Sequence, residues 1–145
     1  MRFMMIVIPK GYEKAKPGAM PDAKLVAEMT KFNESLQKSG VMLSGEGLHP
    51  PSMGARVAFA GGKPKVIDGP FAEAKEVIGG FWMIQVKSKA EAIEWAKRCP
   101  NPMPEESELE IRQVFEAEDF GAALTSELRE QEERLRAQIE QSKGS

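Results

Sequence analysis

Charged residues gather in one short segment of the chain, residues 68–76, which has the sequence Asp-Gly-Pro-Phe-Ala-Glu-Ala-Lys-Glu. Asp68 follows a predicted strand, so its carboxylate would be held at the end of a sheet, where it could act as a general base or bind a donor group of a substrate. The competing interpretation is turn formation, because an Asp side chain readily accepts hydrogen bonds from backbone N–H groups two residues on. The residue types alone favour the turn.

Three further charged residues of this segment, Glu73, Lys75 and Glu76, form a second group. Glu73 and Glu76 would share one face of a helical turn, where two acids raise each other's proton affinity and can work as an acid–base pair. Lys75 could bind an anionic substrate at the rim of a pocket or bridge two subunits. The simpler interpretation is a solvated turn, since exposed ion pairs contribute little.

A second candidate site element, residues 45–51, has the sequence Gly-Glu-Gly-Leu-His-Pro-Pro. Glu46 stands between two glycines, so its carboxylate lies on uncrowded backbone. His49 is the one histidine of the chain. Because histidine is the side chain suited to proton transfer near neutral pH, any histidine general base must be this residue. The competing interpretation for His49 is an exposed loop residue.

Gly79 and Gly80 precede an apolar run that begins at Phe81. Adjacent glycines permit a close approach of backbone, and a bulge or a tight entry into a strand explains them best. The chain has neither the G-x-x-x-x-G-K-S/T pattern nor a G-x-G-x-x-G pattern that opens a helix after a strand. A nucleotide-binding loop is therefore not predicted.

Together, residues 68–76 and 45–51 resemble the DGPF subgroup of the YCII-related domain family, with its patterns D-G-P-F-x-E-x-K-E and G-E-x-L-x-P-P. The resemblance implies an α+β dimer whose sheets face each other in a barrel-like arrangement, and it makes Asp68 a suspected catalytic residue. Broader relatives have a histidine in the first helix, proposed to pair with this Asp. The comparable residues here, 29–33, contain no histidine, so a His–Asp dyad is not predicted.

We expect these segments to converge on a small-molecule pocket, with Phe71, Phe81 and residues of the first helix as its apolar wall. The catalytic candidates are Asp68, Lys75, Glu46 and His49, and the ligand-binding candidates are Phe71, Glu73, Glu76, Gly80 and Phe81. One relative removes hydrogen chloride from a chlorinated muconolactone. By analogy, the reaction would be a cofactor-free lyase or isomerase proton transfer, with Asp68 as the base and Lys75 holding a carboxylate or enolate.

Two other functions compete with this interpretation. Related proteins are often associated with alternative sigma factors, so the chain could be a non-catalytic ligand-binding or regulatory module with a protein partner. The 68–76 segment could also do no more than stabilise a homodimer.

Composition excludes several classes of protein. The chain has 145 residues and a formal net charge of −2, which gives no broad electrostatic reason to bind nucleic acid or an anionic membrane. One Cys and one His cannot form an internal disulfide or a Cys/His zinc site, so no metal site is predicted and a cytoplasmic setting is expected. No cofactor is predicted either. The apolar start, residues 3–8, is far shorter than the ~20 residues that span a bilayer.

The hydrophobic pattern predicts a β-α-β-(hairpin)-β-α-β order. Strands are predicted at 3–8, 41–44, 81–86 and 109–115, a hairpin at 55–60 and 63–67 with one more buried face, and helices after Asp22, Ser88 and Thr125. Gly40 would end the first helix, and Ser88 with Glu91 would form a capping box. Right-handed crossovers turn this order into a ferredoxin-like α+β sheet with both helices on one face. A second subunit would cover the other face.

Two parts of the chain are expected to differ in character. Residues 1–120 are predicted to form the ferredoxin-like domain, and residues 121–145 an amphipathic helical extension. Its apolar seam consists of Leu124, Leu128, Leu135 and Ile139. We expect this helix to dock on its own domain or on a partner.

Overall fold

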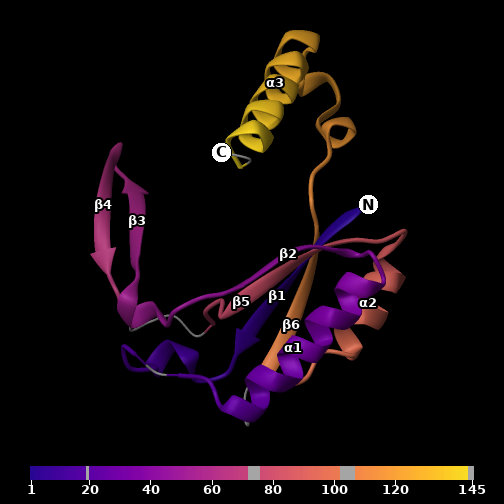
Figure 1. The fold of residues 1–145 in the computed structure, drawn as a ribbon. Helices are drawn as coiled ribbons and strands as arrows, with labels where there is room; N and C mark the ends of the chain where they lie inside the picture. The colour runs from indigo at the N-terminus through magenta and orange to yellow at the C-terminus, as the bar shows by residue number, and fades with distance from the viewer. Residues whose placement is uncertain (19, 72–75, 102–106, 144–145) are drawn as a thin grey trace. The chain divides into compact units, whose positions relative to one another are not determined.

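Within the described residues, four strands form one antiparallel sheet and two more form a separate hairpin (Figure 1). The computed structural model describes residues 1–18, 20–71, 76–101 and 107–143. Its strands are β1 (Arg2–Pro9), β2 (Met42–Gly47), β3 (Ala55–Ala60), β4 (Lys63–Asp68), β5 (Gly80–Gln85) and β6 (Ser107–Gln113). Its helices are α1 (Ala23–Lys38), α2 (Lys89–Lys97) and α3 (Ser126–Lys143), with short 3-10 segments η1 (Tyr12–Lys14), η2 (Pro51–Met53) and η3 (Ala117–Ala123).

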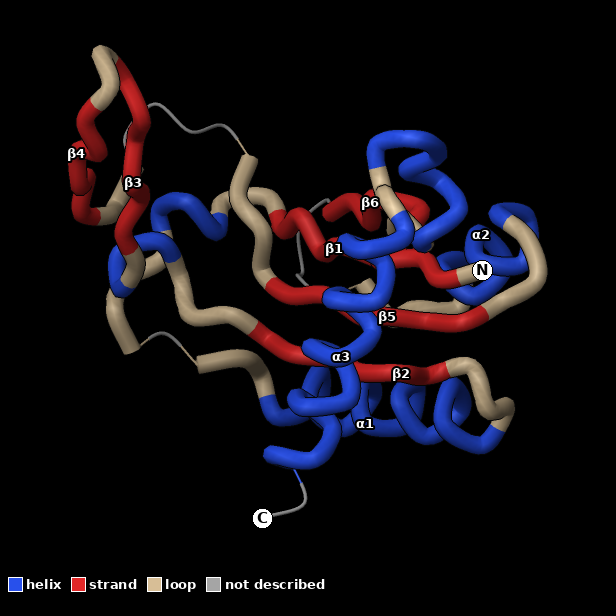
Figure 2. Tube along the Cα trace, turned by 90° about the horizontal axis from the view of Figure 1, so that it is seen from above, coloured by secondary structure: helices blue, strands red, loops and turns tan. Residues whose placement is uncertain are grey.

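The four-stranded sheet has the order β2-β5-β1-β6, and each neighbouring pair is antiparallel. Each helix therefore connects strands that lie two places apart: α1 crosses from β1 to β2, and α2 crosses from β5 to β6. Figure 2 shows the strands side by side, and both helices cover the same face (Figure 1). This α+β arrangement is consistent with the predicted ferredoxin-like fold.

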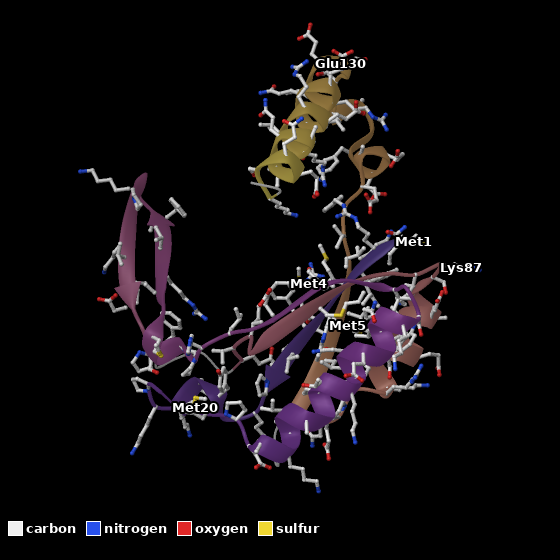
Figure 3. All side chains as sticks on the ribbon, in the orientation of Figure 1. Met1, Met4, Met5, Met20, Lys87 and Glu130 are labelled. Carbon is white, nitrogen blue, oxygen red and sulfur yellow. The ribbon has the colours of Figure 1, made fainter. Side chains whose placement is uncertain are left out.

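One face of the sheet packs against α1 and α2. In β1, Phe3, Met5 and Val7 are buried and alternate with partly buried residues, as a strand with one fully covered face requires. Met4 and Met5 illustrate the alternation, because their side chains leave opposite faces of the sheet (Figure 3). The same core also contains Phe32, Leu36, Val41, Trp82, Ile84, Val86, Ala92 and Trp95. Burial of each large apolar side chain contributes roughly 1.5–3 kcal/mol, so this layer supplies the main stabilisation of the domain.

Trp82 joins β5 to α1 and to β2. Its ring lies edge-on to Phe32, with the ring centroids 5.3 Å apart, and its Nε1 donates a hydrogen bond of 2.7 Å to Asn33 Oδ1. The edge strand passes so close to the indole that a Cβ at Gly45 would lie 2.7 Å from Trp82 Cδ1. Glycine at position 45 therefore allows β2 to lie over the indole.

The helices begin and end at the predicted positions. Gly40 follows α1 with a φ of 73°, the left-handed conformation predicted for it. Asp22 occupies the N-cap position of α1, although its side chain makes no capping hydrogen bond. At the start of α2, Ser88 Oγ accepts a hydrogen bond of 3.2 Å from the Glu91 N–H. The prediction of a reciprocal bond to Ser88 is wrong, because the Glu91 carboxylate accepts from the N–H of Lys87 instead, at 2.9 Å.

The hairpin of β3 and β4 is exposed on both faces. It turns at Gly61 and Gly62, whose φ angles are 63° and 79°. One face is predicted to be more buried, but Val57 is 51% and Phe59 82% exposed, and their strand neighbour Arg56 is also exposed. The prediction is wrong because these two strands pair only with each other and not with the four-stranded sheet.

Residues 114–145 form a second compact unit. Its helix α3 begins after Thr125, whose Oγ1 accepts a hydrogen bond of 3.2 Å from the Leu128 N–H, as predicted for an N-cap. Three residues of the predicted apolar seam, Leu128, Leu135 and Ile139, are between 46% and 55% exposed. Most other positions of α3 are polar or charged, and in the described part of the chain we find no helix that combines the length and the hydrophobicity needed to span a membrane.

Phe115 lies in this second unit rather than in the sheet. The alternation of residues 109–115 predicts that it belongs to the last strand, but β6 ends at Gln113. The ring of Phe115 stacks instead on Phe120 of η3, with the centroids 5.1 Å apart. Phe115 therefore packs against an aromatic ring of its own unit and does not occupy the strand position that the pattern predicts.

Candidate ligand-binding site

A hollow of about 340 Å³ lies between the loop that follows β2, the start of β3 and the segment that leads into β5. Its lining residues are His49, Pro50, Pro51, Met53, Gly54, Arg56, Phe71, Glu76, Val77 and Ile78. Most of the lining is apolar, and three side chains carry or can carry charge. A concave apolar surface with a few polar groups is typical of small-molecule sites, whose volumes begin near ~300 Å³.

Arg56 and Phe71 are in direct contact in this hollow. The Cζ atom of the Arg56 guanidinium lies 4.1 Å from the centroid of the Phe71 ring. A cation held over a ring face in this way contributes about 0.5–1 kcal/mol at an exposed site. The contact connects the Phe of the Asp-Gly-Pro-Phe segment to β3, and it restricts the position of the guanidinium group.

Gly69 allows the Asp-Gly-Pro-Phe segment to lie close to the loop before β3. Its N–H donates a hydrogen bond of 2.9 Å to the carbonyl of Gly54. A Cβ at position 69 would lie 1.7 Å from the carbonyl oxygen of Pro51, so no residue with a side chain fits without movement of the backbone. The peptide bond between Gly69 and Pro70 is cis. The glycine of this segment is thus explained by packing alone.

Hydrogen bonds with Tyr12 of η1 and with Ala15, which follows η1, hold the loop between β2 and β3. The hydroxyl of Tyr12 donates to the carbonyl of Leu48, and burial raises the pKa of the Tyr12 phenol above its ordinary value. Ser52 Oγ donates a hydrogen bond of 3.1 Å to the carbonyl of Ala15. The N–H of Leu48 also donates to the carbonyl of Gly79, at 2.9 Å. The loop that carries His49 is therefore attached to both η1 and the start of β5.

Three of the predicted site residues line this hollow together: His49, Phe71 and Glu76. Glu73 and Lys75 lie outside the described residues. The prediction of helix-one residues in the apolar wall is wrong for this hollow, because no described residue of α1 lines it. Pro51, Met53 and Ile78 provide the apolar surface instead, with the buried Pro50 and Val77 behind them.

Asp68 and Glu46 do not line the hollow. Asp68 pairs with Ala55 across the hairpin, whereas the neighbouring Arg56 pairs with Ile67. Because side chains alternate along a strand, Asp68 lies on the opposite face of the hairpin from Arg56. Glu46 lies in β2, so its position is fixed by the pairing of that strand in the large sheet. The predicted convergence of these two carboxylates with the rest of the site is therefore not observed.

Phe81 and Gly80 belong to the sheet rather than to the hollow. Phe81 pairs with Glu46, and both lie on the face of the sheet that α1 and α2 leave uncovered, because the next residue, Trp82, is buried on the helix side. A Cβ at Gly80 would lie 2.8 Å from the carbonyl oxygen of Glu46. The predicted close backbone approach explains Gly80, and it occurs between two strands.

Arg56 is the charged residue of the hollow that the sequence interpretation does not include. The two-residue Gly61-Gly62 turn predicts the register of the hairpin, and hence the pairing of Arg56 with Ile67. The register does not predict the contact with Phe71, because Phe71 lies beyond Asp68, the last residue of β4 that is paired with β3. The contact depends instead on the close approach of Gly69 to Pro51. No local sequence pattern indicates this approach, because the two residues are distant in the chain.

Neither an activated thiol at Cys99 nor a metal-binding cluster is found among the described residues. Burial raises the pKa of the Cys99 thiol to about 12, and its Sγ donates to the carbonyl of Pro100 at 3.3 Å. A protonated, half-buried thiol is a poor nucleophile. Among the described residues, no three His, Cys, Asp or Glu side chains are grouped so that they could hold a metal ion.

The part of the chain that matches a known protein family includes all six strands and the residues that line the hollow. Residues 1–118 match the YCII-related domain. An uncharacterized protein of Rhizobium meliloti (strain 1021), R00369, is 29% identical to the chain over 91 residues, which are 63% of this chain and 73% of that protein. Neither description assigns an activity.

The close approach at Gly69 gives a direct test of the site's framework. Gly69→Ala forces the new methyl group against the Pro51 carbonyl, so we expect a loss of about 1–3 kcal/mol in the free energy of unfolding, the usual cost of overpacking. Gly54→Ala, at the hydrogen-bonding partner of Gly69, is the matched control, since its Cβ would lie 3.6 Å from the nearest atom, an ordinary contact. Urea unfolding measures both variants, and equal stability of the two would contradict this packing.

Proposed function

The chain belongs to the YCII-related domain family, and from that premise we propose that it binds a small organic molecule in the hollow beside Arg56 and Phe71. The observation that carries the proposal is the contact of 4.1 Å between the guanidinium and the ring within a concave, mostly apolar surface. An apolar surface excludes water from a ligand, and a positioned cation gives it orientation and specificity. The segment that contains Phe71 supports membership of the DGPF subgroup.

A homodimer of the barrel-like type is part of this proposal. The face of the sheet opposite α1 and α2 carries a central apolar stripe: Met4, Ile6, Ile8, Phe81 and Met83. These residues are not among those that pack against the described core. Glu108, Glu110 and Arg112 of β6 flank the stripe on one side. A surface of this kind suits a second copy, because a two-fold axis places the apolar stripe on itself and keeps the charged margins at the rim.

An acid–base enzyme is the second candidate function. His49 and Glu76 line the same hollow, so a proton donor and a proton acceptor could act on one bound molecule. This arrangement would support the cofactor-free lyase or isomerase proton transfer that the family resemblance implies, with His49 and Glu76 in place of Asp68. Turnover of a bound lactone or acid, lost in both His49→Gln and Glu76→Gln, would distinguish this enzyme from a binding protein.

A regulatory module is the alternative for the second unit. The half-exposed seam of Leu128, Leu135 and Ile139 has the spacing with which an amphipathic helix enters a hydrophobic groove of another protein. This function does not compete with ligand binding, because the two features lie in different units of the chain.

Filling the hollow tests whether it is a binding site. Ile78 lines the hollow and is 49% exposed, so Ile78→Trp should occupy the space without disturbing the core. We expect fragments that bind the wild-type protein to bind this variant at least about tenfold more weakly, as measured by protein-observed NMR. Val26→Trp is the control, because Val26 is 47% exposed on α1 and does not line the hollow. Equal fragment binding by both variants would refute the site.

A charge in the apolar stripe tests the assembly. We expect sedimentation velocity to give twice the chain mass of 16.0 kDa for the wild-type protein and a monomer for Ile6→Glu, since an interface cannot bury two unpaired carboxylates without a large cost. Val26→Glu, on the exposed side of α1, should remain a dimer. A wild-type monomer, or an Ile6→Glu dimer, would show that this face does not form the interface.

A further inference from the structure

Within the described residues, the guanidinium of Arg56 keeps its hydrogen-bonding capacity. Its contact is with the face of an aromatic ring, which occupies none of its five N–H donors in a bond to an oxygen atom. Between described residues, none of the ion pairs includes Arg56. An arginine that is restrained by a ring and not neutralised by a carboxylate is suited to recognise an anion from outside the chain.

The rest of the hollow limits the kind of anion. Pro51, Met53 and Ile78 line it with apolar side chains that are at least partly exposed, so the body of a ligand would meet apolar surface. Glu76 also lines the hollow, and its negative charge opposes a second negative charge on the ligand. Arg56 and Glu76 together favour a ligand with a single negative charge over a dianion such as a phosphate monoester.

We propose that the hollow binds a small monocarboxylate with an apolar body, its carboxylate held by the N–H groups of Arg56 over Phe71 and its body against Pro51, Met53 and Ile78. This inference rests on the proposed ligand-binding function, and it adds the chemical class of the ligand. The planar fork of the guanidinium matches a carboxylate with two parallel hydrogen bonds, whereas a lysine provides only a point charge. Arg56 therefore sets specificity as well as affinity.

The role of Glu76 follows from the same arrangement. Its carboxylate shares the hollow with that of the ligand, so it weakens the binding of any anion and discriminates most strongly against dianions. Removal of this charge should tighten the binding of a monocarboxylate by a few fold and that of a dianion by more. Removal of the Glu76 charge would weaken the binding of a cationic ligand, because Glu76 attracts a cation.

A matched set of probes tests the proposal on the full chain. Phenylacetate, the neutral phenylacetamide and the dianionic phenyl phosphate share one apolar body, and protein-observed NMR titration gives their dissociation constants. For the wild-type protein we expect phenylacetate to bind roughly tenfold more tightly than phenylacetamide, as a charge-assisted hydrogen-bonded pair provides. Arg56→Gln should abolish this preference, and Arg56→Lys should retain only part of it. Glu76→Gln should increase the affinity for phenyl phosphate by a larger factor than the affinity for phenylacetate.

Lys65→Gln is the control variant. Lys65 pairs with Ala58 and lies on the same face of the hairpin as Arg56, but it does not line the hollow. Loss of this cation should leave the preference for phenylacetate unchanged, which separates recognition by Arg56 from a general effect of charge. Far-UV circular dichroism and the unfolding midpoint show whether Arg56→Gln folds, and Arg56→Lys provides a second test if it does not.

The outcomes separate this inference from the proposed function. If phenylacetate and phenylacetamide bind equally and Ile78→Trp blocks both, the hollow is a ligand site without selection for carboxylates, and the inference fails alone. If Arg56→Gln keeps the preference, another group recognises the anion and the inference also fails. If none of the probes binds in the hollow, while other fragments do, the class of ligand is wrong. If no fragment of any kind binds there, the proposed function fails with it.

Discussion

The approach of the Asp-Gly-Pro-Phe segment to the loop before β3 is the constraint on which the site depends. The N–H of Gly69 bonds to the carbonyl of Gly54 at 2.9 Å, and the carbonyl of Pro51 occupies the space where a side chain at position 69 would begin. Because the chain has glycine there, the two segments can lie at hydrogen-bond distance. Phe71, two residues later, then reaches the guanidinium of Arg56. The geometry of the hollow follows from this single close contact between backbones.

Strand alternation divides the residues of interest between separate surfaces. Arg56 and Asp68 belong to one hairpin but lie on its opposite faces, because they are paired with Ile67 and Ala55 in successive register positions. Glu46 and Phe81 are likewise paired with each other on the uncovered face of the large sheet. Arg56 therefore lines the hollow, Asp68 lies on the other face of the hairpin, and Glu46 lies on the face of the large sheet opposite α1 and α2.

The sequence predicts well those features of the fold that depend on interactions between residues close in the chain. Gly40 ends α1 because few other residues adopt its φ of 73° cheaply. Ser88 begins α2 because its hydroxyl satisfies a free N–H. The alternation of Phe3, Met5 and Val7 identifies the covered face of β1. Each of these features depends on a few neighbouring residues.

The parts that the sequence does not predict depend on contacts between distant segments. Phe59 alternates like a half-buried strand residue, yet it is 82% exposed because its hairpin does not join the large sheet. Arg56 has no local feature that distinguishes it from other strand arginines, since its partner Phe71 is fifteen positions away. The close approach of Gly69 to Pro51 is of the same kind. Only the assembled chain shows which residues share the hollow.

The most direct test of this account is a double-mutant cycle on the contact between Arg56 and Phe71. The free energy of unfolding would be measured by urea titration for the wild-type protein, Arg56→Gln, Phe71→Leu and the double variant. The account predicts a coupling energy of about 0.5–1 kcal/mol, because each substitution removes the same cation–ring contact. Effects that add to within about 0.3 kcal/mol would show that the guanidinium is not held by the ring, and they would contradict the central claim.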